Sequence, residues 1–316
     1  MKRTYLRQIL ISGSDRLLIT ADGLNAALME AFPPTATSLV LSPKTYKEES
    51  KEALAEIMLS MKSAFPEGDV CLTDDFASQE LPYGSIAYHR VWGIVTADCR
   101  WCFSSKQLER DLLDAEANPA ISCHFLHVNS PGGEAWYLDR LSETMRSLSK
   151  PVVVLAEDLC CSAAYYIACH ADVLAGLTAN DTFGCIGTMV RAYDISGWLE
   201  KNGIKVVTAK SSKSDLKNKK YEDLTNGKPE QYIEEVLDPL TEQFIGEVRS
   251  QRSVVGGLPD DDPVLRGESY DTSHAIEKGL ADCTMTMAEA VARAVSLGKE
   301  YAERERIKKS ALNYVL

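Results

Sequence analysis

The stretch CHFLHVNSPGG, residues 123–133, decides the fold. Its first part, Cys123–Val128, is a mostly apolar run of the length of a buried strand. The run leads into Asn129–Gly133, where two glycines permit a tight turn and let backbone N–H groups approach a bound atom. A helix is predicted next, because apolar residues recur at spacings of three and four: Leu138, Leu141, Met145 and Leu148. The stretch therefore predicts a strand, a glycine turn and a helix whose positive N-terminus adjoins the turn, although a plain tight turn without a chemical role fits the same pattern.

Strands and helices alternate on both sides of this stretch. A strand is predicted at Ile86–Val95 and a helix at Ser105–Ala117 before it. After it, we expect strands at Val152–Ala156, Ala171–Ala175, Cys185–Val190 and Lys205–Ala209, with helices from near Ser162 and at Ile195–Asn202. A repeating β/α order predicts an α/β domain with helices packed on a mostly parallel sheet.

Three parts are expected along the chain: an α-rich N-terminal extension (1–83), the main domain (84–284) and a C-terminal helical tail (285–316). The extension has candidate helices at Leu24–Phe32 and Ala53–Ala64, with a polar, lysine-rich stretch at Lys44–Lys51 between them.

A second amphipathic stretch precedes the tail. Tyr232–Val248 places apolar residues on one face and is interrupted by Pro239. Because proline is tolerated in the first turn of a helix, Asp238 is expected to cap a second helix there.

The composition excludes several classes of function. The net charge is -12, so the chain lacks the basic surface that nucleic-acid binding requires. No stretch approaches eighteen apolar residues, so we expect no membrane anchor and a cytoplasmic protein. The nine cysteines are odd in number and several lie in apolar runs, which indicates free thiols. Cys99 and Cys102 form a single CxxC without a second pair, so no metal or other cofactor is expected.

A nucleophile candidate lies where a buried strand meets a helix. The sequence CCSAAYY, residues 160–166, places small residues at this junction and would expose the side chain of Ser162. The backbone N–H of Ala163, like those of Gly132 and Gly133, would then donate to the oxyanion. The alternative for Ser162 is an N-cap, the commoner role of serine at this position. Cys160 and Cys161 have no histidine nearby in sequence to activate them and are interpreted as core thiols.

Four motifs in order resemble the signal peptide peptidase A family, including its phage prohead-protease branch. They are the turn Ser130–Gly133, the segment Ser162–Ala168, the turn Gly184–Gly187, and the late pattern from Gly267 to Asp282. The resemblance covers residues 84–284 and implies a fold of stacked β-β-α units of the ClpP/crotonase type, a Ser–Lys dyad and ring-like homo-oligomers. Ala163 and Ala164 replace the usual pair of glycines.

The resemblance implies a lysine about fifty residues after the serine. Lys217, which precedes Asn218, is the first candidate; Lys213 is the alternative and Lys210 the third. A lysine can act as a base only if burial lowers its pKa, whereas in so charged a stretch the alternative is a solvated surface group.

A Ser–His–Asp triad is not expected. A histidine about twenty-five residues after Ser162 is missing from Phe183–Met189, and His170 lies about two helical turns away. His124 and His127 alternate with core residues of one strand and are interpreted as packed or edge groups.

The segments after Gly133 and Gly187 are expected to flank an extended polypeptide substrate as added strands do, with Glu134, Gly187 and Thr188 in contact with it. The resulting hypothesis is a serine endopeptidase acting in capsid maturation or peptide clearance, in a phage prohead or in the cytoplasm. The alternatives are a crotonase-like acyl-CoA enzyme and an inactive capsid-assembly scaffold.

Overall fold

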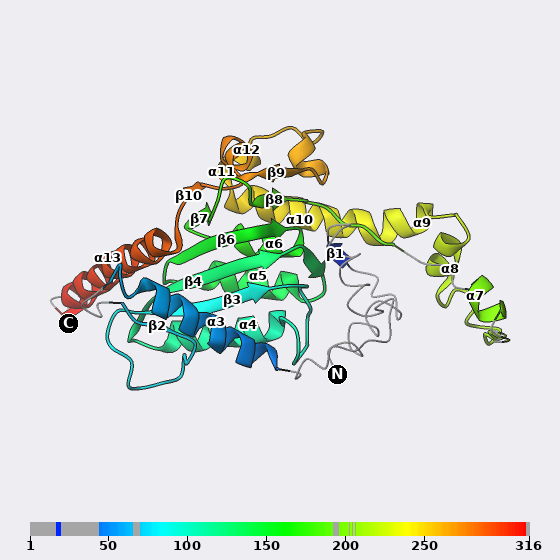
Figure 1. Ribbon diagram of the computed structural model, residues 1–316. Coiled ribbons are helices and arrows are strands. Elements are labelled where there is room, and N and C mark those ends of the chain that lie inside the picture. The colour runs from blue at the N-terminus through cyan, green and yellow to red at the C-terminus, as the bar shows by residue number, and fades with distance from the viewer. Residues whose placement is uncertain are drawn as a thin grey trace.

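The computed structural model describes residues 17–19, 44–65, 70–191, 196–201, 203, 205 and 207–313, and within them an eight-stranded sheet forms the centre of the molecule (Figure 1). Its main path runs β10-β7-β6-β4-β3-β2, and every pair along this path is parallel. The strands on the path are β2 (Leu72–Thr73), β3 (Ser85–Trp92), β4 (Ile121–Ser130), β6 (Val152–Cys161), β7 (Val173–Gly176) and β10 (Cys283–Thr284). The expected α/β class with a parallel sheet is confirmed.

Two short strands extend the sheet beyond β7. Strand β8 (Thr182–Gly184) pairs in parallel with the last part of β6, and β9 (Ser269–Asp271) pairs antiparallel with β8. A separate two-stranded sheet joins β1 (Leu17–Ile19) to β5 (Gly132–Glu134). Strand β5 follows β4 directly, so this small sheet lies at the carboxyl end of the large one.

Helices cover both faces of the sheet. One face packs against α4 (Ser105–Ala117), α5 (Leu138–Ser147), α6 (Ala163–Ala168) and α10 (Asp238–Gln251). The other face packs against α3 (Tyr46–Met61) and α13 (Met287–Asn313). The remaining elements are α7 (Ser196–Lys201), α8 (Lys219–Thr225), α9 (Glu230–Tyr232), the π-helix η1 (Ile233–Leu237), α11 (Ser253–Gly256), the 3₁₀ helix η2 (Pro263–Arg266) and α12 (Thr272–Glu277).

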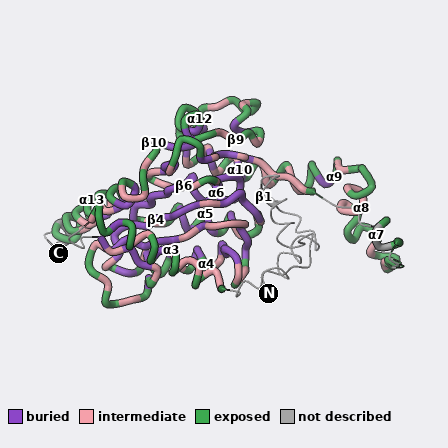
Figure 2. The backbone as a smooth tube through the Cα atoms, viewed as in Figure 1, coloured by how far each residue is buried: buried purple, intermediate pink, exposed green. Residues whose placement is uncertain are grey.

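The two central strands explain why the chain folds this way. Nearly every residue of β4 is buried, and successive side chains alternate between the two layers: Leu126 belongs to the core of α4–α6, whereas Phe125 packs with α3 and α13. Continuous apolar strands of this kind are typical of a parallel sheet covered on both sides. Figure 2 shows the buried residues gathered along β4 and β6.

An elongated arm leaves this body. It comprises α7, α8, α9, η1 and the first part of α10, and Figure 1 shows α8 and α7 well beyond the end of the sheet. Residues 207–218 on this arm are mostly exposed, including the apolar side chains of Val207 and Leu216.

The predicted elements agree with the structure unevenly. Helix α4 has the predicted bounds, and β3, β4, β6 and α13 lie where expected. Helix α3 begins earlier than predicted, because Thr45 and Glu48 form a capping box, so the polar stretch 44–51 is mostly helical. The predicted helix at 24–32 lies outside the described residues.

Three predictions about the second half of the domain are wrong. The strand predicted at 185–190 is β8, which ends at Gly184, and the described residues 205 and 207–209 form no strand. Asp238 is the first residue of α10 rather than its cap, with Pro239 in the first turn as expected.

The N-terminal part of the described chain shares its core with the sheet. Leu54 and Met61 of α3 and Leu72 of β2 pack in the same cluster as Phe125 of β4. The three-part division of the chain stays a prediction.

Candidate active site

Ser162 occupies a sharp turn between β6 and α6. Its φ of 55° and ψ of -121° lie in a region that residues with a Cβ rarely adopt. The Ser162 N–H donates to the carbonyl of Gly184 at 2.8 Å, and the Ser162 carbonyl accepts from the N–H of Tyr166 at 2.9 Å. Although Ser162 precedes the helix, its side chain makes no capping hydrogen bond, so the alternative role of N-cap is wrong.

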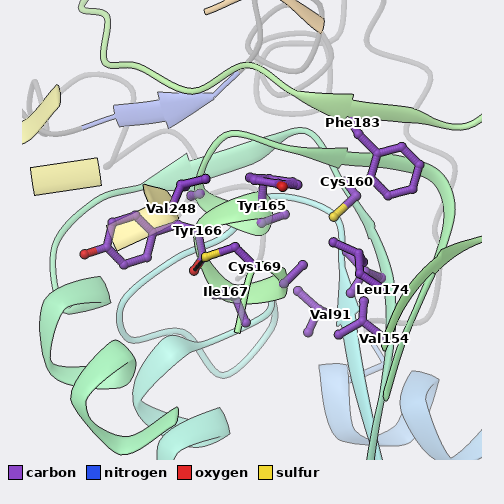
Figure 3. Packing of buried hydrophobic residues seen from close by; sticks show 14 of the residues in the cluster. Val91, Val154, Cys160, Tyr165, Tyr166, Ile167, Cys169, Leu174, Phe183 and Val248 are labelled. Carbon is purple, nitrogen blue, oxygen red and sulfur yellow. Dashed lines mark hydrogen bonds between the residues drawn. The ribbon is translucent and has the colours of Figure 1, made fainter. Parts of the chain in front are cut away.

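Packing of α6 holds this turn in place. Every residue of α6 is buried; the Tyr165 hydroxyl donates to the carbonyl of Leu280 at 2.9 Å, and the Tyr166 ring lies 5.0 Å from that of Phe244. Figure 3 shows Tyr166 beside Val248, and Cys160 near Phe183. The buried helix α6 therefore fixes the position of the Ser162 backbone.

The predicted exposure of the Ser162 side chain is wrong, because the residue is 1% exposed; its Oγ has no well-formed hydrogen bond among the described residues. The Cys185 thiol lies beside it: burial raises the pKa of Cys185, and the Ser269 and Ser162 hydroxyls lower it in part. An unpaired buried hydroxyl is costly unless it serves a purpose. Ser162 therefore remains the candidate nucleophile.

Two backbone N–H groups are available as oxyanion donors. Ala163 is the first residue of α6, and its N–H has no acceptor among the described residues. Strand β5 packs against α6 and brings Gly133 nearby. The N–H of Gly132, predicted as a third donor, instead donates to Ser130 Oγ at 3.1 Å. The sequence feature that indicates this hydrogen bond is the serine two residues before Gly132, because a serine hydroxyl often accepts from the N–H two residues later in a turn.

Gly133 is held by a contact that only glycine allows. A Cβ at this position would lie 2.0 Å from the Val95 carbonyl oxygen. Val95 donates its N–H to the Gly132 carbonyl at 2.9 Å and accepts from the Glu134 N–H at 2.8 Å. Because N–H and C=O groups alternate along a strand, those of Gly133 point to the opposite edge. The predicted helix N-terminus at this turn is wrong, because β5 intervenes and α5 begins only at Leu138.

The predicted substrate contacts have partners of their own. The Glu134 carboxylate accepts from the Ala97 N–H at 2.9 Å, and Thr188 Oγ1 donates to the Leu237 carbonyl at 2.8 Å. Both side chains thus fix loops around the site. Gly187 follows β8 near the start of the arm, so all three residues stay predictions as substrate contacts.

The three candidate lysines lie on the arm. Lys210 forms an ion pair with Glu222 of α8 at 2.7 Å. Lys213 and Lys217 are exposed, and Lys217 lies two residues before α8. Since Figure 1 shows α8 out on the arm, between α9 and α7, and α6 within the body, one chain does not bring these lysines to Ser162.

A buried lysine elsewhere is not an alternative base. Lys150 donates from Nζ to the Ala115 and Asn118 carbonyls at 2.7 Å each, and burial lowers its pKa. It precedes β6, whereas Ser162 follows that ten-residue strand. At about 3.3 Å per residue, the strand separates the two by roughly 30 Å.

The histidines serve packing, as predicted. His124 and His127 are buried in β4, where their Nε2 atoms contact the carboxylates of Glu116 at 3.2 Å and Glu157 at 2.8 Å. His170 pairs with Glu247. A Ser–His–Asp triad is therefore not built around Ser162 by these residues.

The seven cysteines other than Cys99 and Cys102 are free thiols, and Cys99 Sγ accepts the N–H groups of Trp101 and Cys102. Within the described ranges, no three His, Cys, Asp or Glu residues are placed to hold a metal ion. Over the same ranges, no helix combines the length and apolar character needed to cross a bilayer.

A cavity of about 450 Å³ lies away from Ser162, between the start of α3, the edge of β3 and the loop around Cys99. Ser162 is not among its lining residues, so this cavity is separate from the candidate active site.

Residues 144–300 match the sequence profile of peptidase family S49. The match covers just under half of the 316 residues. The S49 region contains Ser162 and the three candidate lysines, whereas Gly132 and Gly133 precede it. The resemblance to the signal peptide peptidase A family is thereby confirmed.

Two curated relatives agree with the S49 match. A Methanocaldococcus jannaschii protein named "Putative protease MJ0651" is 27% identical over 180 residues, which cover 56% of this chain and 57% of that protein. An Enterococcus faecium protein named "Putative signal peptide peptidase SppA" is 26% identical over 171 residues, 53% of this chain and 48% of that protein. The matches thus span about half the length of each relative.

Two solved structures resemble this chain in fold. A ClpP1 mutant from Listeria monocytogenes aligns with a TM-score of 0.39 at 9% identity, over 65% of this chain and 94% of that one. An enoyl-CoA hydratase/isomerase family member aligns with a TM-score of 0.41 at 13% identity, over 71% and 74%.

Proposed function

We propose that the protein is a serine endopeptidase in which Ser162 attacks the peptide carbonyl, the N–H groups of Gly133 and Ala163 bind the oxyanion, and a lysine is the base. The geometry of Ser162 carries this proposal: a strained residue between β6 and α6 with a buried, unpaired hydroxyl beside β5. Such strain persists where the surrounding structure imposes it for a purpose. The S49 match of the region around Ser162 supports the same reaction.

The reaction needs no cofactor. The base takes the proton of Ser162 Oγ as that atom bonds to the peptide carbonyl carbon, and returns it to the departing amine. Water then attacks the resulting ester, which releases the carboxylate and restores the hydroxyl. Two preorganised N–H donors stabilise the oxyanion in both steps.

The lysine comes from a second copy of the chain. Lys217, with Lys213 as the alternative and Lys210 as the third candidate, lies on an arm that extends from the body. If copies pack head to tail, the arm of one reaches the Ser162 of the next, and contact there buries the lysine and lowers its pKa. The active species is therefore a homo-oligomer.

The test is hydrolysis of a denatured protein by the wild type and by Ser162→Ala, Lys217→Ala, Lys213→Ala and Lys210→Ala, each checked for folding and oligomeric state. We expect loss in the serine variant and in one lysine variant. Mixing these two inactive variants, after dissociation and reassembly, should restore part of the activity, because some interfaces then pair an intact serine with an intact lysine. Equal activity in all five proteins would overturn the proposal.

The same chemistry would serve capsid maturation in a phage prohead or clearance of peptides in the cytoplasm. We favour maturation, since the sequence motifs resemble the phage prohead-protease branch. Rates on long unfolded chains and on short peptides should then favour the long chains; faster cleavage of short peptides would favour clearance instead.

A further inference from the structure

A segment of the chain far from the active site in sequence lies along β5. Strand β1 pairs antiparallel with β5, with Leu17 opposite Glu134, Leu18 opposite Gly133 and Ile19 opposite Gly132. Figure 1 shows β1 at the carboxyl end of the sheet, where β5 lies. An extended segment of this chain therefore occupies the edge where a substrate strand would pair.

The register gives the position of one carbonyl group. One edge of β5 is used by Val95, so the N–H and C=O of Gly133 face β1. Residues directly opposite each other at such a position exchange their N–H and C=O groups across an antiparallel ladder. The Leu18 carbonyl thus lies opposite the Gly133 N–H, which is a donor of the proposed oxyanion hole.

The register of the large sheet brings the Ser162 turn toward the start of β5. Ser130 of β4 is paired with Cys160 of β6, and two residues later the two strands reach Gly132 and Ser162. Strand β5 also packs against α6. Strand β5 thus contacts β1 on one side and the helix after Ser162 on another, and we infer that the three meet at Gly133.

We propose that Leu17–Ile19 is a substrate segment of the protein itself, and that Ser162 cleaves the bond between Leu18 and Ile19. The inference rests on the proposed function, since it uses the same nucleophile and donors. Ser162 Oγ bonds to the Leu18 carbonyl carbon, the bond to the Ile19 nitrogen breaks, and the lysine passes the serine proton to that nitrogen. Water hydrolyses the Leu18 ester, so the products are a segment ending at Leu18 and a chain beginning at Ile19.

Cleavage would also open the site. As long as β1 pairs with β5, an external peptide cannot add to the same edge, because each backbone group of a strand edge has one partner. Hydrolysis of an external substrate should therefore begin with a lag that ends as residues 1–18 are released.

The experiment follows the full-length protein by intact mass and N-terminal sequencing while hydrolysis of a denatured protein is measured in the same sample. The wild type should yield a chain that begins at Ile19, and Ser162→Ala should stay intact. Leu18→Pro should slow this cleavage about tenfold or more, because proline has no N–H for the Gly133 carbonyl. The matched change Leu10→Pro, eight residues upstream, should leave it unchanged.

The outcomes separate the two proposals. The self-cleavage proposal is overturned if the external protein is hydrolysed but no chain beginning at Ile19 forms, or if the chain is cleaved elsewhere. Either result leaves the proposed function unaffected. A chain beginning at Ile19 in Ser162→Ala as well identifies a foreign protease and also overturns it. Absence of both reactions in a folded oligomer overturns the proposed function itself.

Discussion

The Glu247 carboxylate lies 2.8 Å from Nε2 of His170, and this ion pair joins α10 to the end of the helix that Ser162 begins. Burial opposes the charge on His170, but Cys169 and Glu247 raise its pKa to about 10. Burial likewise opposes the charge on Glu247, but His170 and Arg146 lower its pKa to about 2.

These shifts define a pH window. The His170 charge contributes stability that is complete below its ordinary pKa of 6.5 and is lost as pH rises through about 10. The Glu247 charge contributes stability that is complete above 4.5 and is lost as pH falls through about 2. The pair therefore contributes most between pH 4.5 and 6.5.

Glu247→Gln should lower the free energy of unfolding by about 3 kcal/mol at pH 6, because it leaves His170 without its carboxylate. Above pH 10 the difference from the wild type should shrink. Urea unfolding at both pH values measures this. The control is Glu143→Gln, which removes an exposed pair with Arg140 and should cost less than about 1 kcal/mol. An equal loss at both pH values would contradict the assigned ion pair.

Gly133→Ala should reduce hydrolysis by about 10²-fold or more, because a Cβ there meets the Val95 carbonyl and displaces the oxyanion donor. Steady-state rates on a denatured protein test this, after circular dichroism shows that the variant folds. Gly246→Ala on α10 is the matched control: its added methyl group meets nothing within 4 Å, so activity should stay unchanged. Unchanged activity in Gly133→Ala would remove Gly133 from the oxyanion hole.

Lys150→Met should destabilise the fold by about 1–3 kcal/mol, because the Ala115 and Asn118 carbonyls lose their donor. Activity per folded molecule should remain, since Lys150 lies at the opposite end of β6 from Ser162. Denaturant unfolding and active-site titration with a serine-reactive probe separate the two effects. A folded but inactive Lys150→Met would mean that this lysine is the base after all.

Local signals predicted the body of the fold well. Helix α4 was found with its bounds because Leu108 and Leu112 recur on one buried face and Ser104 supplies the cap. The buried strands β4 and β6 were equally plain as apolar runs. Helix α3 was predicted too short because its charged first turn obscured the capping box of Thr45 and Glu48.

Only those parts of the candidate site that depend on neighbouring residues in the sequence were predicted. The Ser162 turn follows from small residues after a buried strand, but the pairing of β1 with β5 joins segments more than a hundred residues apart and leaves no local mark. The same limit applies to the lysine: the residue order names Lys217 as a candidate base, but it does not show that the arm separates Lys217 from Ser162 within one chain.

The backbone conformation of Ser162 lowers the stability of the fold at the residue that we propose as the nucleophile. Its positive φ costs about 1–3 kcal/mol for any residue with a Cβ, and glycine would escape that cost. Ser162→Gly should therefore unfold at a higher urea concentration than Ser162→Ala, although both lack the hydroxyl. A chain freed from catalysis would gain thermal resilience by this one change, so the proposed nucleophile lowers the stability of the fold that holds it.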